Sequence, residues 1–356
     1  MKKLIVVALA LGALQICPAQ EYKIAIVGLV HSHVWGHLAN ILKSHDVKLV
    51  GVAEPNPALV AEAEKAGVDK SLITSENYVQ MLDRSKPDIV WAFVENNRHL
   101  EIVKACAARK INVIFEKPLA STGADAREIQ KIAKQTGIRI QTNYQMAWWP
   151  ANYVAKKAAE TELGQVYRLH GIVGHGGPGA NGVRSQYFFA WLTDPVKNGA
   201  GALMDFGCYN ALWSLWYLGK PDTVYATANH LRPEEFPKVE DNADLVLGYK
   251  KGVGIFEASW DLPRGFQDLE VYGLKGSVYM QQKSVTLQTA RAKAAHDLDL
   301  TPLPLEESEP VAFMASRIRQ NKPIEGLTAI DINVGVIEII DAAKQSIASG
   351  KAVKLQ

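Results

Sequence analysis

The stretch Lys110-Ile-Asn-Val-Ile-Phe-Glu-Lys-Pro118 is the part of the sequence that decides the expected fold. Its first six residues predict a short buried strand, and the following segment, Thr122 to Gly137, has apolar residues at helical spacing. Glu116 and Lys117 therefore follow a strand in an alternating strand–helix pattern, where open α/β sheets bind ligands. Pro118 biases Lys117 away from helical geometry. We expect its ammonium group to act on a substrate oxygen, the alternative being an ordinary surface lysine.

The same alternation continues along the chain on both sides of this stretch. Strands are predicted at residues 22–28, 47–53, 87–94 and 138–142, and helices at residues 32–43, 57–66 and 99–108. Strands and helices that alternate with short loops indicate a parallel, doubly wound sheet. Residues 21–145 are therefore expected to form an α/β Rossmann domain that binds a dinucleotide.

The pattern changes after about residue 143. A helix is predicted at residues 151–161 and a strand at 165–175, followed by strands at 223–231, 243–249, 252–260, 267–272 and 277–281 and a long helix at 328–349. Turns with lysine and glycine separate the later strands, as in antiparallel hairpins. Residues 146–356 are expected to form an α+β domain with a large, mainly antiparallel open sheet that serves substrate binding and oligomerisation.

The first twenty residues have the features of an export signal. A basic start, Met1-Lys-Lys3, precedes an apolar run from Leu4 to Leu14, and a small residue, Ala19, precedes a cleavage point after Ala19 or Gln20. The run is shorter than the roughly 20 apolar residues that span a bilayer. We therefore expect a Sec-type signal peptide at residues 1–20, a periplasmic or secreted protein, and no stable membrane insertion.

Charge and cysteine content exclude several classes of protein. The chain carries 39 basic and 37 acidic residues, a balance that does not favour binding to nucleic acid. Ile16 disfavours a lipoprotein site at Cys17, because a small residue is wanted there. After cleavage only Cys106 and Cys208 remain, and we expect them to form neither a disulfide nor a metal site.

The turn Gly28-Leu-Val-His-Ser-His33 lies where a dinucleotide fingerprint would carry three glycines. Gly28 is in place, while Val30 and His33 occupy the second and third positions. The second glycine lets the backbone approach the pyrophosphate, so Val30 should push the phosphates outward or alter the turn. The following helix still offers backbone N–H groups to an anion, joined by side-chain donors from His31, Ser32 and His33.

Glu54 ends the second predicted strand, 26 residues after Gly28. An acid at this position commonly accepts hydrogen bonds from the ribose hydroxyls of NAD. The same carboxylate would repel a 2′-phosphate, so NAD is favoured over NADP. The alternative is a plain exposed glutamate in a turn.

Histidines near the glycine turn raise the question of a metal site. His33 and His37 lie one helical turn apart, with His31 just before them. No carboxylate stands between them in an HExxH arrangement, and histidines at a helix start more often bind anions or cap the helix. We expect no metal.

The segment Gly199-Ala-Gly-Ala-Leu-Met-Asp-Phe-Gly-Cys-Tyr209 predicts small residues leading into a helix. Asp205 and Tyr209 are four residues apart and would share one face. The carboxylate could orient the phenol, and an ammonium such as Lys117 would lower the pKa of Tyr209 towards the range of proton transfer. The alternative is a core tyrosine whose hydroxyl Asp205 satisfies. The glycine-rich residues 174–182 are expected to form a mobile loop beside this site.

Together these residues resemble the glucose–fructose oxidoreductase / inositol dehydrogenase superfamily, often written Gfo/Idh/MocA, over essentially the whole chain after the leader. The resemblance rests on the strand–glycine–helix start, Glu54, the Glu116-Lys117-Pro118 triplet and the Trp191–Pro195 and Gly201–Tyr209 stretches. It also rests on Asn96 and His99, in a segment that usually reads Thr-Pro-Asn-x-x-His. Glu95, Ala147 and Leu212 replace a proline, an arginine and an aspartate that are common there, which indicates an outlying branch.

The resemblance implies roles for these residues. Lys117 would be the catalytic lysine near the nicotinamide, and Tyr209 with Asp205 the acid/base pair. The residues implied in cofactor binding are Gly28, Val30, His31, Ser32, His33, Glu54, Asn96, His99, Glu116, Lys117 and Trp191. The expected substrate is a sugar, polyol or glycoside hydroxyl, and the expected assembly is a homodimer or homotetramer formed through the open sheet.

Export adds a constraint, because an exported enzyme meets no free pool of NAD(H). We therefore expect a tightly bound NAD in a sugar oxidoreductase. One alternative is an NAD-dependent glycoside hydrolase or lyase that oxidises the sugar transiently, eliminates the leaving group and returns the hydride. The other is a sugar-binding protein that has lost the cofactor.

Overall fold

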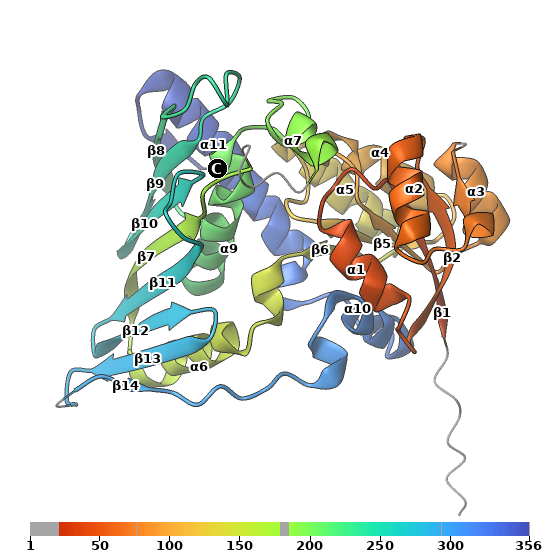
Figure 1. The fold of residues 1–356 in the computed structure, drawn as a ribbon. Helices are drawn as coiled ribbons and strands as arrows, with labels where there is room; N and C mark the ends of the chain where they lie inside the picture. The colour runs from red at the N-terminus through yellow and green to blue at the C-terminus, as the bar shows by residue number, and fades with distance from the viewer. Residues whose placement is uncertain (1–20, 76, 179–184, 293, 356) are drawn as a thin grey trace, which may run out of the picture.

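The computed structural model describes residues 21–75, 77–178, 185–292 and 294–355 (Figure 1). The predicted signal peptide at residues 1–20 lies outside the described residues, as do residues 179–182 of the predicted glycine-rich loop. Within the described part, no helix is both long and apolar enough to cross a membrane.

The N-terminal domain is built on a six-stranded parallel sheet with the strand order β3-β2-β1-β4-β5-β6. Its strands are β1 (Tyr22–Val27), β2 (Val47–Ala53), β3 (Ile73–Thr74), β4 (Ile89–Ala92), β5 (Asn112–Glu116) and β6 (Ile140–Asn143). This order confirms the predicted doubly wound Rossmann sheet, and it places the reversal of strand order between β1 and β4. The carboxyl ends of β1, β4 and β5 therefore meet at one edge.

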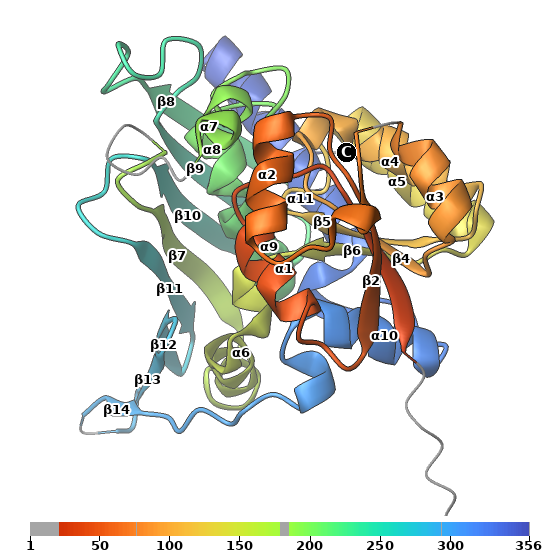
Figure 2. The same cartoon turned by 45° about the vertical axis from the view of Figure 1, so that its right-hand side comes forward.

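Helices cover both faces of this sheet, as Figure 2 shows. They are α1 (Val34–Ile41), α2 (Pro57–Lys65), α3 (Tyr78–Ser85), α4 (His99–Ala107) and α5 (Gly123–Thr136). Thr122 caps α5 by accepting from the N–H of Asp125, and Gly137 ends it in the left-handed conformation. The helix predicted from residue 32 begins two residues later, because His33 is its N-cap.

The C-terminal domain carries a nine-stranded sheet in the order β14-β13-β12-β11-β7-β10-β9-β8-β15. Its strands are β7 (Val166–Gly174), β8 (Thr223–Asn229), β9 (Asn242–Tyr249), β10 (Gly252–Ser259), β11 (Phe266–Gly273), β12 (Gly276–Gln281), β13 (Ser284–Thr289), β14 (His296–Asp297) and β15 (Val353–Lys354). Only β7 and β10 run parallel among the paired strands. The predicted, mainly antiparallel sheet is confirmed.

The remaining helices follow β6 in the chain. They are α6 (Pro150–Glu162), α7 (Gln186–Leu192), α8 (Ala202–Asp205), α9 (Gly207–Leu218), α10 (Pro310–Arg319) and α11 (Ile330–Ser349). Helix α11 packs against α9 and β8 of its own domain and against α5 of the other. Helix α10 falls in the range predicted for the second domain, yet its Val311 and Met314 lie in the hydrophobic core that β1 and β2 form.

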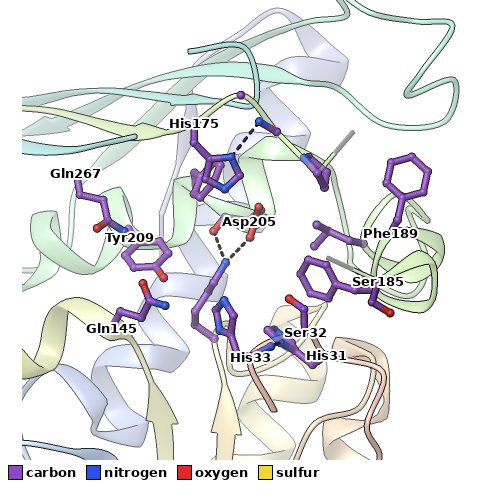
Figure 3. A pocket seen from close by; sticks show the side chains of 17 residues that line it. His31, Ser32, His33, Gln145, His175, Ser185, Phe189, Asp205, Tyr209 and Gln267 are labelled. Carbon is purple, nitrogen blue, oxygen red and sulfur yellow. Dashed lines mark hydrogen bonds and ion pairs between the residues drawn. The ribbon is translucent and has the colours of Figure 1, made fainter. Parts of the chain in front are cut away.

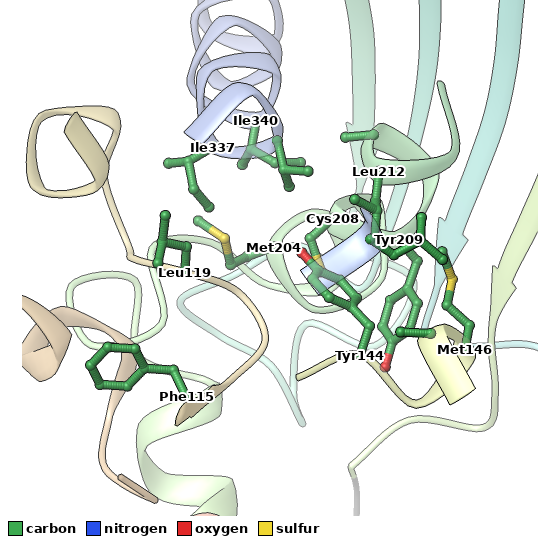
Figure 4. Close-up of a cluster of buried hydrophobic side chains, with 14 of the residues drawn as sticks. Phe115, Leu119, Tyr144, Met146, Met204, Cys208, Tyr209, Leu212, Ile337 and Ile340 are labelled. Atoms are coloured by element: carbon green, nitrogen blue, oxygen red, sulfur yellow. The ribbon is translucent and has the colours of Figure 1, made fainter. Parts of the chain in front are cut away.

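A shared hydrophobic core fixes the two domains against each other at the end of β5. Figure 4 shows Phe115 and Leu119 from the N-terminal domain near Met204, beside Ile337 of α11. All four are buried. Because this core joins the end of β5 to α8, which ends at Asp205, it holds Lys117 close to Asp205.

Cys106 and Cys208 are free thiols, in agreement with the expectation that they form no disulfide, and both are buried. Burial raises the pKa of each to about 12. Neither is therefore a reactive thiolate at neutral pH.

Candidate active site

Lys117 and Asp205 form a buried ion pair where the two domains meet (Figure 3). The Lys117 ammonium donates to the Asp205 carboxylate and, at 2.7 Å, to the Asp205 backbone carbonyl. The second carboxylate oxygen accepts from Trp260 Nε1 at 2.9 Å. The carboxylate is thus held from two sides, and it orients the lysine.

The charges of this pair are stable near neutral pH. Burial alone would lower the pKa of Lys117, but the Asp205 carboxylate outweighs burial and the pKa is raised. Burial would likewise raise the pKa of Asp205, but Lys117 and then Trp260 outweigh it and the pKa is lowered. The pair therefore presents an ammonium cation and a carboxylate anion.

Tyr209 lies beside the pair, but the prediction that it shares a helix with Asp205 is wrong. The chain leaves the helical path at Phe206, so Asp205 ends α8 while Tyr209 belongs to α9. Among the described residues no hydrogen bond joins Asp205 to Tyr209. Instead, Lys117 Nζ lies 5.1 Å from the centre of the Tyr209 ring.

The predicted lowering of the pKa of Tyr209 is also wrong. Burial raises this pKa, and the lowering that Lys117 exerts does not compensate for it. The sequence pointed to the nearby ammonium, but it did not show that Tyr209 is only 3% exposed or that Asp205 pairs with the ammonium. Tyr209 therefore presents a neutral hydroxyl.

The turn after β1 requires glycine at Gly28. Its φ is +78°, and an added Cβ would lie 2.5 Å from Val94 Cγ1 and 3.1 Å from the Phe93 carbonyl oxygen. Trp191 supports the turn from α7, because its Nε1 donates to the Val30 carbonyl at 3.3 Å. Two residues implied in cofactor binding, Val30 and Trp191, are thus brought together.

Glu54 holds the same turn from the end of β2. Its carboxylate accepts from the N–H of Leu29 at 2.7 Å and from the N–H of Asn56 at 2.8 Å, and the residue is 2% exposed. Burial raises the pKa of Glu54 despite these two N–H donors. The plain exposed glutamate of the alternative interpretation is not what the structure shows, and the contact with ribose remains a prediction.

Glu116 connects the end of β5 to the histidines of α1. One carboxylate oxygen accepts from His33 Nδ1 at 2.9 Å, and the other lies 3.4 Å from His37 Nε2 and accepts from Asn143 Nδ2 at 2.8 Å. Burial would raise the pKa of Glu116, but the hydrogen bonds from His33 and His37 hold it well below its usual range. The Glu116 carboxylate is therefore charged, and it contacts the last residue of the glycine turn, His33.

His31, His33 and Glu116 bring nitrogen and oxygen donor atoms within 4.8 Å of one another. Such atoms can bind a metal ion. Because Glu116 accepts from Nδ1 of His33, however, that nitrogen carries a proton here, and Nδ1 of His31 accepts from the N–H of His33 at 3.3 Å. Hydrogen bonds within the protein explain the cluster, and the absence of a metal remains a prediction.

Asn96 and His99 hold loops next to the site through hydrogen bonds to Asn198 and Leu119. Asn96 Nδ2 donates to Asn198 Oδ1 at 2.8 Å, and His99 Nδ1 donates to the Leu119 carbonyl at 3.0 Å. The His99 ring stacks on Phe115, with the ring centres 4.1 Å apart. Both residues are buried, so here they order the loops after β4 and β5.

A cavity of about 580 Å³ lies over these groups. Figure 3 shows His31 and Ser32 on one side, Gln145, Tyr209 and Gln267 on the other, and Asp205, the partner of Lys117, between them. Sequence reasoning missed Gln145 and Gln267 as wall residues, and it placed His175 beside the site only as part of the glycine-rich segment. Each glutamine is a single polar residue near the end of an element, and no local pattern marks it.

The residues at the glycine turn fit a dinucleotide. The tight turn at Gly28 leaves no room for a side chain, and the buried Glu54 carboxylate orders it. Helix α1 begins at Val34, at the end of the same loop. These are the parts that a Rossmann fold uses for the pyrophosphate and the ribose.

Comparison with known proteins agrees with this geometry. A family model described as "Oxidoreductase family, NAD-binding Rossmann fold" matches residues 22–144, and a model of the GFO/IDH/MocA C-terminal domain matches residues 152–279. The chain belongs to the GFO/IDH/MocA family. Family members of this kind include sugar dehydrogenases, so the comparison supports an enzyme.

Among curated GFO/IDH/MocA relatives, D-xylose 1-dehydrogenase (NADP(+)) 2 of Haloferax volcanii is 26% identical over 288 residues, which cover 78% of this chain and 84% of the relative. Levoglucosan dehydrogenase of Pseudarthrobacter phenanthrenivorans is 25% identical, with 69% of this chain and 68% of the relative covered. Myo-inositol 2-dehydrogenase of Thermotoga maritima is 24% identical, with 68% and 70% covered.

Solved structures of the GFO/IDH/MocA fold superimpose over nearly the whole chain. The aldose-aldose oxidoreductase from Caulobacter crescentus has a TM-score of 0.79 at 20% identity, covering 94% of this chain and 100% of that one. Levoglucosan dehydrogenase in complex with NADH and levoglucosan has a TM-score of 0.78 at 20% identity, covering 95% and 100%. At these identities the likeness establishes the fold.

Proposed function

We propose that the protein oxidises a hydroxyl group of a sugar or glycoside, with NAD held tightly as the hydride acceptor. The observation that carries the proposal is the Lys117–Asp205 ion pair, which faces a cavity bounded on one side by the glycine-turn residues His31 and Ser32. A bound nicotinamide would supply the two-electron chemistry that protein side chains lack.

The residues of the cavity supply binding and charge. The Lys117 ammonium is placed to donate a hydrogen bond to the reacting oxygen and to stabilise the negative charge that develops on it. Asp205 and Trp260 keep the ammonium in position. Tyr209 and His175 both line the cavity, and they are the groups placed to relay the hydroxyl proton.

A panel of sugars, polyols and glycosides tests this function. Purified protein is mixed with each compound and NAD or NADP, and the absorbance of the reduced nicotinamide is followed. We expect reduction with at least one member of the panel. Absence of reduction with every member, in protein that is folded by circular dichroism, would contradict net oxidation.

A redox-neutral glycoside hydrolase or lyase is the second candidate. A second cavity beside the first one favours it, because two adjoining cavities suit a substrate with two units. Such an enzyme would release the aglycone from a glycoside without net reduction of the nicotinamide. Chromatography of the products separates it from the first candidate.

We further propose that the protein works outside the cytoplasm after loss of residues 1–20. The support is the basic and apolar leader in the sequence. N-terminal sequencing of the protein from the fractionated host would find a start at residue 20 or 21. A cytoplasmic protein that retains Met1 would contradict export.

We also propose assembly into a homodimer or homotetramer through the outer face of the nine-stranded sheet. Tyr225 and Val246 lie opposite each other on β8 and β9 and are 41% and 39% exposed. Light scattering coupled to size exclusion should give two or four times the mass that mass spectrometry finds for the single chain.

A further inference from the structure

A second cavity, of about 540 Å³, adjoins the one that Lys117 lines. The two cavities share four wall residues, namely Gln145, His175, Phe206 and Gln267. In Figure 3, Gln145 and Gln267 lie on the side of the first cavity that faces away from His31 and Ser32. The spatial order is therefore the glycine turn, Lys117, the shared wall and then the second cavity.

The second cavity is formed where several strands of the large sheet end together. Strand β7 ends at Gly174, next to the start of β11 at Phe266, and β12 turns into β13 between Gln281 and Ser284. Gln145 closes the cavity from the segment after β6. Elements from both domains thus build it.

The wall of the second cavity is polar and partly pre-ordered. Asp268, which is 9% exposed, accepts from Gln281 Nε2 at 2.9 Å and from the Tyr279 hydroxyl at 2.8 Å. The Arg264 guanidinium lies 3.5 Å from the centre of the Phe266 ring and 3.6 Å from Asp268. The Gln281 side chain is therefore already held in place by Asp268 before any ligand binds.

The chemistry of this wall suits the hydroxyl groups of a sugar. Amide side chains both donate and accept hydrogen bonds, guanidinium and ammonium groups donate, and a serine hydroxyl does both. These groups come from Gln267, Gln281, Gln282, Arg264, Lys283 and Ser284. Each of the two cavities has the size of a small-molecule pocket, roughly 300 to 1,000 Å³.

We propose that the second cavity binds a second sugar unit, joined by a glycosidic bond to the unit that reacts at Lys117. The substrate is then a disaccharide or a longer glycoside rather than a free monosaccharide. The assignment rests on the proposed function in one respect, namely that the reacting unit occupies the first cavity. The binding of the second unit does not depend on turnover.

Calorimetric titration tests the proposal without any reaction. The probes are methyl glycosides of glucose, galactose, xylose and mannose, each compared with disaccharides that have the same non-reducing sugar. We expect at least one disaccharide to bind about tenfold more tightly than its methyl glycoside, which corresponds to about 1.4 kcal/mol. Equal affinities throughout the panel, or no binding of any sugar, would overturn the proposal.

A pair of variants locates the effect. In Arg264→Ala/Lys283→Ala the ratio of disaccharide to methyl-glycoside affinity should fall about tenfold, towards one. Lys251→Ala is the matched control, because Lys251 is exposed in the turn between β9 and β10 at the opposite end of the same sheet. A ratio that survives in the double variant would place the second unit elsewhere and overturn the assignment.

The proposed function and this inference fail in different ways. If the protein is not an oxidoreductase, no nicotinamide is reduced while the preference for disaccharides persists. If the second cavity binds no sugar, nicotinamide reduction can proceed with monosaccharides and disaccharides at equal affinity. The two measurements on one preparation therefore separate the two failures.

Discussion

The carboxyl ends of β1 and β5, two strands of the Rossmann sheet, differ in how closely they follow the family pattern. At the end of β5 the chain keeps Glu116 and Lys117, which are both buried and hydrogen-bonded. After β1 it keeps only Gly28, with Val30 and His33 where glycines are usual. The structure joins the two ends, because His33 binds Glu116. His33, which replaces a usual glycine in the turn after β1, is therefore held in place by Glu116 at the end of β5.

The largest expected effect comes from the intact end, at Lys117. In Lys117→Met the side chain keeps its length but loses its charge, so the developing negative charge on substrate is no longer stabilised. We expect kcat to fall by about a thousandfold, as when an oxyanion donor is removed. Steady-state kinetics measures this.

A surface lysine provides the control for this variant. Lys131→Met alters a side chain that is 58% exposed, and it should leave kcat unchanged. Circular dichroism should show both variants folded. Full activity of Lys117→Met would remove the proposed mechanism.

The dependence of stability on pH tests the role of His99, whose ring stacks on Phe115 of β5. Burial lowers the pKa of His99 from its ordinary value of 6.5 to about 4, although the Leu119 carbonyl opposes the shift. The fold thus favours the neutral ring. Its contribution to the free energy of unfolding is complete above pH 6.5 and is lost as the pH falls through the folded value. The loss by pH 4 is about 3 kcal/mol.

Denaturant unfolding from pH 7 to pH 4 measures this contribution. The stability of His99→Gln should fall less steeply with acid than that of the unmodified protein, because the titrating ring is gone. Burial also lowers the pKa of His31, which acts in the same direction in both proteins and cancels in the difference. If the free energy of unfolding fell equally with acid in both proteins, the claim that His99 is buried as a neutral ring would be contradicted.

A double-mutant cycle tests whether the ends of β1 and β5 are coupled. Glu116→Gln and His33→Gln, singly and together, should give a coupling energy of about 1 to 2 kcal/mol in urea unfolding. His170 and Glu257, which are 43% and 45% exposed on the large sheet, form the control pair. Their coupling should stay below about 0.5 kcal/mol. Equal coupling energies for the Glu116–His33 pair and the His170–Glu257 pair would contradict the claim that the ends of β1 and β5 stabilise each other.

The smallest expected effect comes from restoring the family pattern at β1. Val30→Gly removes the side chain that we expect to keep the backbone away from the pyrophosphate, while the hydrogen bond from Trp191 to the Val30 carbonyl is retained. The extra flexibility of glycine costs up to about 1 kcal/mol. We expect NAD to bind about three- to tenfold more tightly in calorimetry. Weaker binding would contradict the expectation that the Val30 side chain holds the pyrophosphate away from the backbone.

Much of the fold was predictable because its signals are local. The strand before Glu116 and the helix after it follow from hydrophobic spacing, and Thr122 and Gly137 mark the ends of that helix. The two-residue strand β3 is too short to give such a signal. The return of α10 to the N-terminal core depends on tertiary packing.

The site was predictable only where a motif carries it. Lys117 and Asp205 were found from their motifs, but their pairing comes from the packing of the two domains. The break in the helix at Phe206 and the depth at which Tyr209 is buried were not visible in the sequence. Gln145 and Gln267 line the same cavity only because the ends of strands from the two sheets come together there.

The most direct test of the account is to denature the purified protein and identify any released nucleotide by mass spectrometry. The account predicts NAD or NADH at close to one molecule per chain, since Gly28, Glu54 and the start of α1 form the site. A protein that releases no nucleotide, and that binds neither NAD(H) nor NADP(H) in a titration, would contradict it.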